Sequence, residues 1–87
     1  MPDAFRVLLV DDSETVTGML SWLLGSAGYA IETAGDGVKG VRAAFRRVPD
    51  LVVMSTRLPR LDGIQACRLL KAEPATRDVP VILLTSE

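Results

Sequence analysis

The amino-acid sequence predicts a single parallel α/β domain with the element order β-α-β-α-β-α-β. Short apolar runs alternate with longer stretches in which apolar residues recur at helical spacing. Continuous apolar runs are typical of strands that are buried on both faces of a parallel sheet. The 87 residues contain no internal repeat and no linker-like stretch, so we expect one hydrophobic core.

The first strand is predicted at residues 6–10 and the first helix directly after it. Arg6-Val7-Leu8-Leu9-Val10 is a continuous apolar run that ends at the polar Asp11-Asp12-Ser13. From Ser13 onward an apolar stripe has helical spacing and ends at Gly28, a typical left-handed cap. The members of this stripe are Val16, Met19, Leu20, Leu23, Leu24 and Ala27.

The second strand and helix are predicted between residues 29 and 48. Tyr29-Ala30-Ile31-Glu32-Thr33 alternates as a strand does. Asp36 is the predicted N-cap of the helix, and Pro49 ends it. The side chains expected to point inward are Val38, Val41, Phe45 and Val48.

The remaining elements follow the same pattern. Leu51-Val52-Val53-Met54 is the third strand, and Asp62 caps a third helix that Glu73-Pro74 breaks. Val81-Ile82-Leu83-Leu84 is the fourth strand. The inward residues of the third helix are expected to be Ile64, Cys67 and Leu70.

Composition excludes several classes of function. The net charge is -1 and the ten Lys and Arg residues are scattered along the chain, so we expect no direct nucleic-acid binding. No apolar run is long enough for a membrane span and no signal peptide is evident, so a cytoplasmic location is expected. The chain has no histidine and only Cys67, which excludes an internal disulfide and a Cys/His zinc site.

Polar residues follow three of the predicted strands. They are Asp11 and Asp12, then Ser55, Thr56 and Arg57, and finally Thr85, Ser86 and Glu87. Right-handed crossovers bring the carboxyl ends of parallel strands to one edge of the sheet, where active groups gather. The sequence therefore predicts a cation-binding, phosphate-related pocket at this edge.

Four segments in register resemble the receiver domain of bacterial two-component response regulators, the CheY-like family. They are Val10-Asp11-Asp12-Ser13, Pro49-Asp50-Leu51-Val52-Val53-Met54, Leu58-Pro59-Arg60-Leu61-Asp62-Gly63 and Val79-Pro80-Val81-Ile82-Leu83-Leu84-Thr85. The resemblance spans the whole chain and implies a flavodoxin-like parallel sheet of order 2-1-3-4. It also implies that residues 1–87 form one receiver domain, incomplete at its C-terminus, that lacks the family's final helix-strand-helix and the lysine on its fifth strand.

The resemblance implies a role for each residue at the edge. Asp11 and Asp12 match the acidic pair that holds Mg²⁺, and the backbone carbonyl of Arg57 matches a third ligand. Thr85 matches the switch hydroxyl that bonds the phosphoryl group, although a strand-end turn residue is an alternative for it.

Ser55 is the main departure from the family pattern, because the resemblance implies the phosphate-accepting aspartate at this position. A carboxylate is an anionic nucleophile at neutral pH and also ligates metal, whereas a serine hydroxyl needs a general base. We therefore expect no ordinary aspartyl phosphorylation and weak or absent Mg²⁺ binding. The Arg57 guanidinium is a candidate substitute cation near Asp11 and Asp12, with a solvated loop arginine as the alternative.

Three functions fit these residues to different degrees. The first is a phosphorelay receiver whose partners are a sensor histidine kinase and a downstream output domain or protein. The second is a phosphorylation-independent pseudo-receiver that acts as a protein-protein interaction module. The third, a metal-dependent phosphatase or nucleotide-binding enzyme, is disfavoured because no Gly-rich phosphate loop follows the first strand and the aspartyl nucleophile is absent, so we expect no enzyme.

Two surfaces are expected to make contacts. Gly18, Trp22 and Gly25 lie on the side of the first helix away from its apolar stripe, so Trp22 is a candidate interaction residue. The fourth strand, Val81 to Leu84, is expected to be an unprotected apolar edge. It is expected to be covered by a second copy in a homodimer, by an exchange of elements between copies, or by further sequence beyond Glu87.

Overall fold

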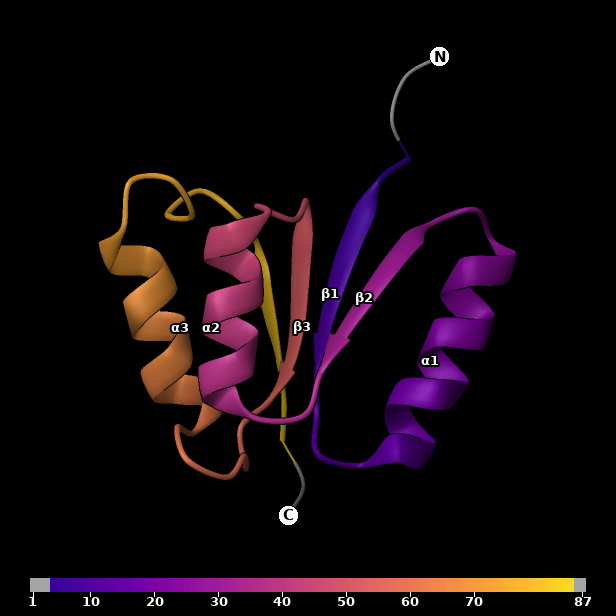
Figure 1. The fold of residues 1–87 in the computed structure, drawn as a ribbon, viewed down its shortest axis with the longest axis horizontal. Helices are drawn as coiled ribbons and strands as arrows, with labels where there is room; N and C mark the ends of the chain where they lie inside the picture. The colour runs from indigo at the N-terminus through magenta and orange to yellow at the C-terminus, as the bar shows by residue number, and fades with distance from the viewer. Residues whose placement is uncertain (1–3, 86–87) are drawn as a thin grey trace.

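The computed structural model of the chain describes residues 4–85. Strands and helices alternate in the order that the sequence predicts (Figure 1). The elements are β1 (Arg6–Val10), α1 (Glu14–Ser26), β2 (Ala30–Ala34), α2 (Gly37–Arg46), β3 (Leu51–Ser55), α3 (Gly63–Ala72) and β4 (Val81–Leu84).

The strands form one sheet of order β2-β1-β3-β4, and every neighbouring pair is parallel. This confirms the predicted order and the flavodoxin-like, CheY-like architecture as far as β4. All strands run downward in Figure 1, so their carboxyl ends meet at the lower edge of the sheet. The loops that follow β1 and β3 lie together at that edge.

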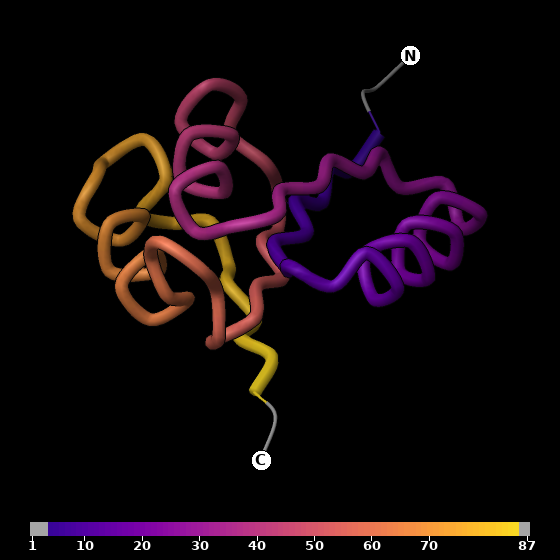
Figure 2. The backbone as a smooth tube through the Cα atoms, turned by 60° about the horizontal axis from the view of Figure 1, so that its bottom comes forward, coloured from indigo at the N-terminus to yellow at the C-terminus, as the bar shows by residue number. Residues whose placement is uncertain are grey.

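Helices cover both faces of the sheet. Helix α1 packs against β1 and β2 on one face, whereas α2 and α3 lie side by side on the other (Figures 1 and 2). The main core fills the space between the sheet and the α2–α3 layer. Its buried side chains are Leu8, Val10, Ala34, Val41, Ala43, Ala44, Val52, Met54, Ala66, Leu70 and Val79.

Each helix begins at a residue that caps it. Ser13 Oγ accepts a hydrogen bond from the Val16 N–H at 3.2 Å, and Asp36 Oδ1 accepts one from the Lys39 N–H at 2.8 Å. Asp62 and Gln65 exchange side-chain and backbone hydrogen bonds in a capping box. These caps confirm the predicted helix starts. Gly28 has a φ of 99°, which confirms the left-handed turn after α1.

The predicted inward faces of α2 and α3 were partly wrong, since Phe45 and Ile64 are 46% and 49% exposed. In α2, Gly40 and Ala44 are buried instead. A Cβ atom at Gly40 would lie 2.8 Å from Val10 Cγ1, so the helix backbone lies directly on β1 at this small residue. Helix α2 also ends at Arg46, which leaves Val48 outside it and 42% exposed.

Helix α1 has no fully buried residue. Val16, Leu20 and Leu24 of its predicted stripe are half-buried, whereas Met19 and Leu23 are exposed. Trp22 is 71% exposed, as expected for the side away from the stripe. Within residues 4–85, no helix is both long enough and apolar enough to cross a membrane.

Strand β4 is exposed along most of its length. It pairs only with β3 among the described residues, and Val53 lies opposite Ile82 in the register. Ile82 is 49% exposed and Leu84 is 38% exposed, because α1 packs mainly on β1 and β2. This strand is therefore an apolar sheet edge in the part of the chain that the structure describes, as the sequence predicts.

Candidate functional site

The structure brings the five predicted site residues into one open hollow at the carboxyl edge of the sheet. Asp11 and Asp12 follow β1, Ser55 ends β3, Arg57 follows it, and Thr85 follows β4. Val16 and Leu84 complete the lining of this hollow, which has a volume of about 350 Å³. The sequence did not indicate these two apolar contributions.

Asp11 is held by the backbone on both sides. Its N–H donates to the carbonyl oxygen of Ala34 at 3.1 Å, which ties the end of β1 to the end of β2. Its Oδ1 accepts a hydrogen bond from the Ser13 N–H at 2.9 Å. Asp12, by contrast, is exposed. One carboxylate of the pair is thus fixed and the other faces solvent.

The Ser55 hydroxyl bonds within its own loop. Its Oγ donates to the carbonyl oxygen of Arg57 at 3.2 Å and accepts a hydrogen bond from the Arg57 N–H at 3.3 Å. The carbonyl that the family resemblance assigns to the metal is therefore the acceptor of the Ser55 proton.

The Arg57 side chain is exposed and forms no ion pair with Asp11 or Asp12, both of which the structure describes. The alternative of a solvated loop arginine agrees with this arrangement. Thr85 lines the hollow and is exposed, next to Leu84, whose carbonyl oxygen accepts a hydrogen bond from the Thr56 N–H at 2.9 Å. The ends of β3 and β4 are thereby joined at the site.

Gly63 fixes the distance between α3 and the site. Its N–H donates to the carbonyl oxygen of Thr56 at 3.0 Å. A Cβ atom at this position would collide with the carbonyl group of Ser55 and would lie 2.9 Å from Thr56 Cα. The motif that contains Gly63 did not predict this contact.

The loop between β3 and α3 contains a second feature that sequence reasoning missed. Arg60 has a φ of 72°, a left-handed conformation that is uncommon for a residue with a side chain. The Leu61 N–H donates to the carbonyl oxygen of Pro59 at 2.8 Å, which closes a tight turn around Arg60. Arg60 Nη1 also lies 3.6 Å from Asp36 Oδ2 and joins this loop to the start of α2.

The donor set suits a hard cation only in part. Two carboxylates, Asp11 and Asp12, and the carbonyl of Arg57 contribute oxygen atoms of the kind that Mg²⁺ prefers. Ser55 contributes a neutral hydroxyl. Within residues 4–85 no three Asp, Glu, His or Cys side chains lie close enough together to form a metal site.

The prediction that basic residues are scattered over the molecule was wrong for half of them. Of the ten Lys and Arg residues, five line two adjoining hollows along β2 and α2. They are Arg6, Lys39, Arg42, Arg46 and Arg47. The fold gathers them because α2 packs beside β2 and the start of β1.

Comparison with known proteins identifies relatives of the whole described fold. Residues 7–87 match the family model described as the response regulator receiver domain. The DNA-binding dual master transcriptional regulator RpaA of Synechocystis is 37% identical over 93% of this chain. The chain spans 34% of the length of that regulator.

Solved structures share the backbone arrangement. The signal receiver domain of a signal transduction histidine kinase from Syntrophus aciditrophicus has a TM-score of 0.91 and 38% identity, with 97% of this chain and 64% of that chain covered. The receiver domain of the sensor histidine kinase PA1611 from Pseudomonas aeruginosa has a TM-score of 0.92 and 36% identity, and the match covers 98% of this chain and 70% of that chain. The latter structure contains a magnesium ion coordinated in its active site cleft.

Proposed function

The chain belongs to the response regulator receiver domain family, and from that membership we propose that it is a signalling module of a two-component phosphorelay that cannot accept phosphate in this form. The observation that carries the proposal is the position of Ser55. Ser55 lines the same hollow as Asp11 and Asp12, at the position where the family resemblance calls for an aspartate. Treating the chain and its Ser55→Asp variant with a small phosphodonor tests the proposal.

The chemistry of the acceptor supports this proposal. When a carboxylate accepts a phosphoryl group, its oxygen attacks phosphorus and the bond between phosphorus and the donor's leaving group breaks, with a nitrogen leaving from phosphohistidine and an oxygen from an acyl phosphate. A hydroxyl must also lose its proton to a base. Ser55 directs its proton to the Arg57 carbonyl, and the chain contains no histidine. The module is thus proposed to be neither phosphorylated nor an enzyme.

Asp11, Asp12 and the carbonyl of Arg57 are the groups that would hold Mg²⁺, as a magnesium ion is held in the cleft of the Pseudomonas relative. The ion would supply positive charge next to an incoming phosphoryl group. We propose that binding is weak or absent here for two reasons. Ser55 brings no negative charge, and its hydroxyl competes for the Arg57 carbonyl.

The proposed partners follow from the family role. They are a sensor histidine kinase and a downstream output domain or protein, in the cytoplasm. The curated relative RpaA is described as a DNA-binding transcriptional regulator, and this chain covers about a third of it, 34%. We propose no contact with nucleic acid through the present residues.

A second candidate function is a phosphorylation-independent interaction module, a pseudo-receiver. Within residues 4–85 β4 pairs only with β3 and exposes apolar side chains, and a strand in this arrangement can pair with another chain. A second copy pairing through β4 is the proposed contact. Trp22 on α1, which is 71% exposed, is the alternative contact.

A charge placed on the β4 edge tests the homodimer. We expect Ile82→Lys to weaken self-association about tenfold or more, because pairing would bury the ammonium group against apolar side chains. Sedimentation velocity over a range of micromolar concentrations measures the change. Ile64→Lys on α3 is the matched control, since Ile64 and Ile82 are both 49% exposed.

The outcomes separate the two surfaces. Equal association of the Ile82→Lys and Ile64→Lys variants would exclude the β4 contact. If Trp22→Ala alone abolishes association, the contact lies on α1. A parent chain that remains monomeric at every concentration would exclude both homodimers.

A further inference from the structure

A basic groove runs along the sheet edge opposite β4. We define it by the five cations Arg6, Lys39, Arg42, Arg46 and Arg47, which line two adjoining hollows of about 360 and 410 Å³. Glu32 is the one carboxylate in the lining of either hollow. The groove lies between the outer side of β2 and the exposed side of α2 and plays no part in the phosphate-related site.

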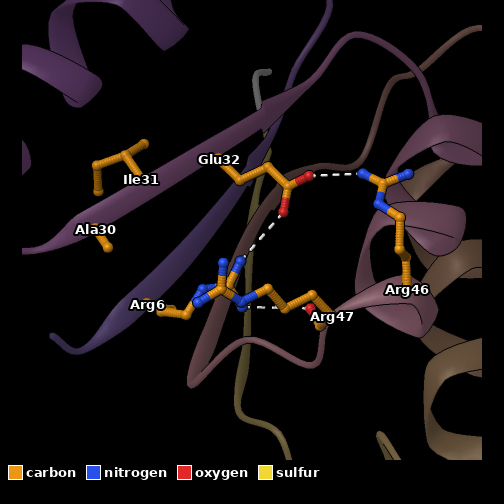
Figure 3. A pocket seen from close by; sticks show the side chains of 6 residues that line it. All are labelled: Arg6, Ala30, Ile31, Glu32, Arg46 and Arg47. Atoms are coloured by element: carbon orange, nitrogen blue, oxygen red, sulfur yellow. Dashed lines mark hydrogen bonds and ion pairs between the residues drawn. The ribbon is translucent and has the colours of Figure 1, made fainter. Parts of the chain in front are cut away.

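Figure 3 shows how Glu32 is held in this groove. Its Oε1 accepts from Arg6 Nη2 at 3.3 Å and its Oε2 accepts from Arg46 Nη2 at 2.8 Å. Arg6 Nη1 also donates to the carbonyl oxygens of Arg47 and Val48. The network fixes Arg6 and joins β2 to the end of α2, so the walls of the groove are already in place.

The other three cations of the basic groove remain available. Lys39, Arg42 and Arg47 are exposed, and none of them forms an ion pair with a residue in the range 4–85. A groove lined by charges of one sign raises the local concentration of ions of the opposite sign. The basic groove therefore carries an excess of positive charge on a chain whose net charge is -1.

The floor of the basic groove is an open strand edge. In the described sheet β2 pairs only with β1. The Ala30 N–H donates to Phe5 and the Ala34 carbonyl accepts from Asp11, so these residues direct their backbone groups toward β1. Alternate residues of a strand direct their groups to opposite sides. Ile31 and Thr33 therefore present their N–H and C=O groups outward.

We propose that the basic groove binds an extended acidic peptide segment of another protein, which adds a strand beside β2. Backbone hydrogen bonds to Ile31 and Thr33 would hold the added strand. Carboxylates on its alternate residues would face the cations of α2. This proposal is independent of the function proposed for the phosphate-related site.

The spacing of the cations fits such a strand. Arg42 and Arg46 are one helical turn apart, a rise of about 6 Å along α2. Side chains on one face of a strand repeat every ~7 Å. Two carboxylates on alternate residues of the added strand thus match the separation of the two arginines, of which Arg42 forms no ion pair among residues 4–85 and Arg46 shares its guanidinium group with Glu32. Guanidinium groups suit this role because they bind carboxylates with two parallel hydrogen bonds.

A peptide explains the groove better than a nucleic acid does. A nucleic acid would be attracted only by the cations of the groove. Glu32 lines both hollows, and its carboxylate would repel a continuous row of phosphates. A peptide can avoid Glu32 by placing a neutral side chain there. A peptide backbone can also form hydrogen bonds with the outward N–H and C=O groups of β2. A phosphate backbone has no N–H groups and cannot form such a ladder of hydrogen bonds.

The test uses a capped peptide of alternating valine and glutamate, about the length of β2, and fluorescence anisotropy of the labelled peptide. We expect saturable binding that the matching valine-glutamine peptide lacks. Amide hydrogen exchange should slow at Ile31 and Thr33 in the complex, because an added strand accepts their hydrogen bonds. The same experiment with an oligothymidine strand compares the affinity of the acidic peptide with that of a polyanion that has no peptide backbone.

Substitutions locate the binding surface. The double variant Arg42→Gln/Arg46→Gln is expected to weaken peptide binding about tenfold or more. The control Arg68→Gln/Arg77→Gln removes the same charge from exposed positions outside the groove and should leave binding unchanged. Absence of binding, equal loss in both variants, or unchanged exchange at Ile31 and Thr33 would overturn the proposal. Tighter binding of oligothymidine would identify the groove as a nucleic-acid surface and would overturn it as well.

Discussion

The Ser55→Asp variant is expected to bind Mg²⁺ at least about tenfold more tightly than the parent chain. The substitution adds a third carboxylate to Asp11 and Asp12 in the same hollow. It also removes the hydroxyl that donates to the Arg57 carbonyl, which frees this oxygen for the metal. Titration with Mg²⁺, followed through the amide resonances of residues 11–13, measures both affinities.

Ser55→Asn is the matched control for this measurement. Asparagine has the shape of aspartate without its charge, so it should give a much smaller gain in Mg²⁺ affinity. If the Asp and Asn variants bind Mg²⁺ equally, the missing charge at position 55 is not what limits the site. Saturation of the parent chain at sub-millimolar Mg²⁺ would contradict the weak binding proposed for it.

Gly63→Ala is expected to lower the free energy of unfolding by about 1–3 kcal/mol, the cost of overpacking a rigid contact. The added methyl group would collide with the Ser55 carbonyl, and both groups belong to backbone that cannot easily shift. Either α3 or the end of β3 must move, which also displaces Ser55 and Arg57. Chemical denaturation at one fixed protein concentration measures the loss.

The substitution Gly18→Ala should instead raise the free energy of unfolding. A Cβ atom at Gly18, within α1, meets no atom within 4 Å. Replacing a helical glycine by alanine in open space stabilises by about 0.5–1 kcal/mol. Equal effects of Gly63→Ala and Gly18→Ala would show that α3 does not press on β3 as described.

The order and approximate positions of the elements could be predicted because each depends on local sequence. Ser13, Asp36 and Asp62 begin their helices through hydrogen bonds that span three residues. The residues of the site were likewise predictable, because parallel strands place Asp11, Asp12, Ser55, Arg57 and Thr85 at one edge. The positions of the elements follow from residues that are close in the sequence, and the residues of the site follow from the parallel direction of the strands.

Tertiary packing decided what the sequence could not predict. The spacing of apolar residues suggested Phe45 as a core residue, but the buried face of α2 includes the small residues Gly40 and Ala44, and Phe45 is 46% exposed. The basic groove depends on pairs such as Arg6 with Glu32, which belong to different strands. The two hydrogen bonds between Ser55 and Arg57 depend on a rotamer and a loop conformation.

We propose that Ser55 prevents the module from accepting phosphate. The most direct measurement is the intact mass of the chain after incubation with acetyl phosphate and Mg²⁺, compared with that of the Ser55→Asp variant. We predict that the parent chain remains unmodified and that the variant gains one phosphoryl group. A phosphorylated parent chain, or a variant that stays unmodified while it binds Mg²⁺, would contradict the claim.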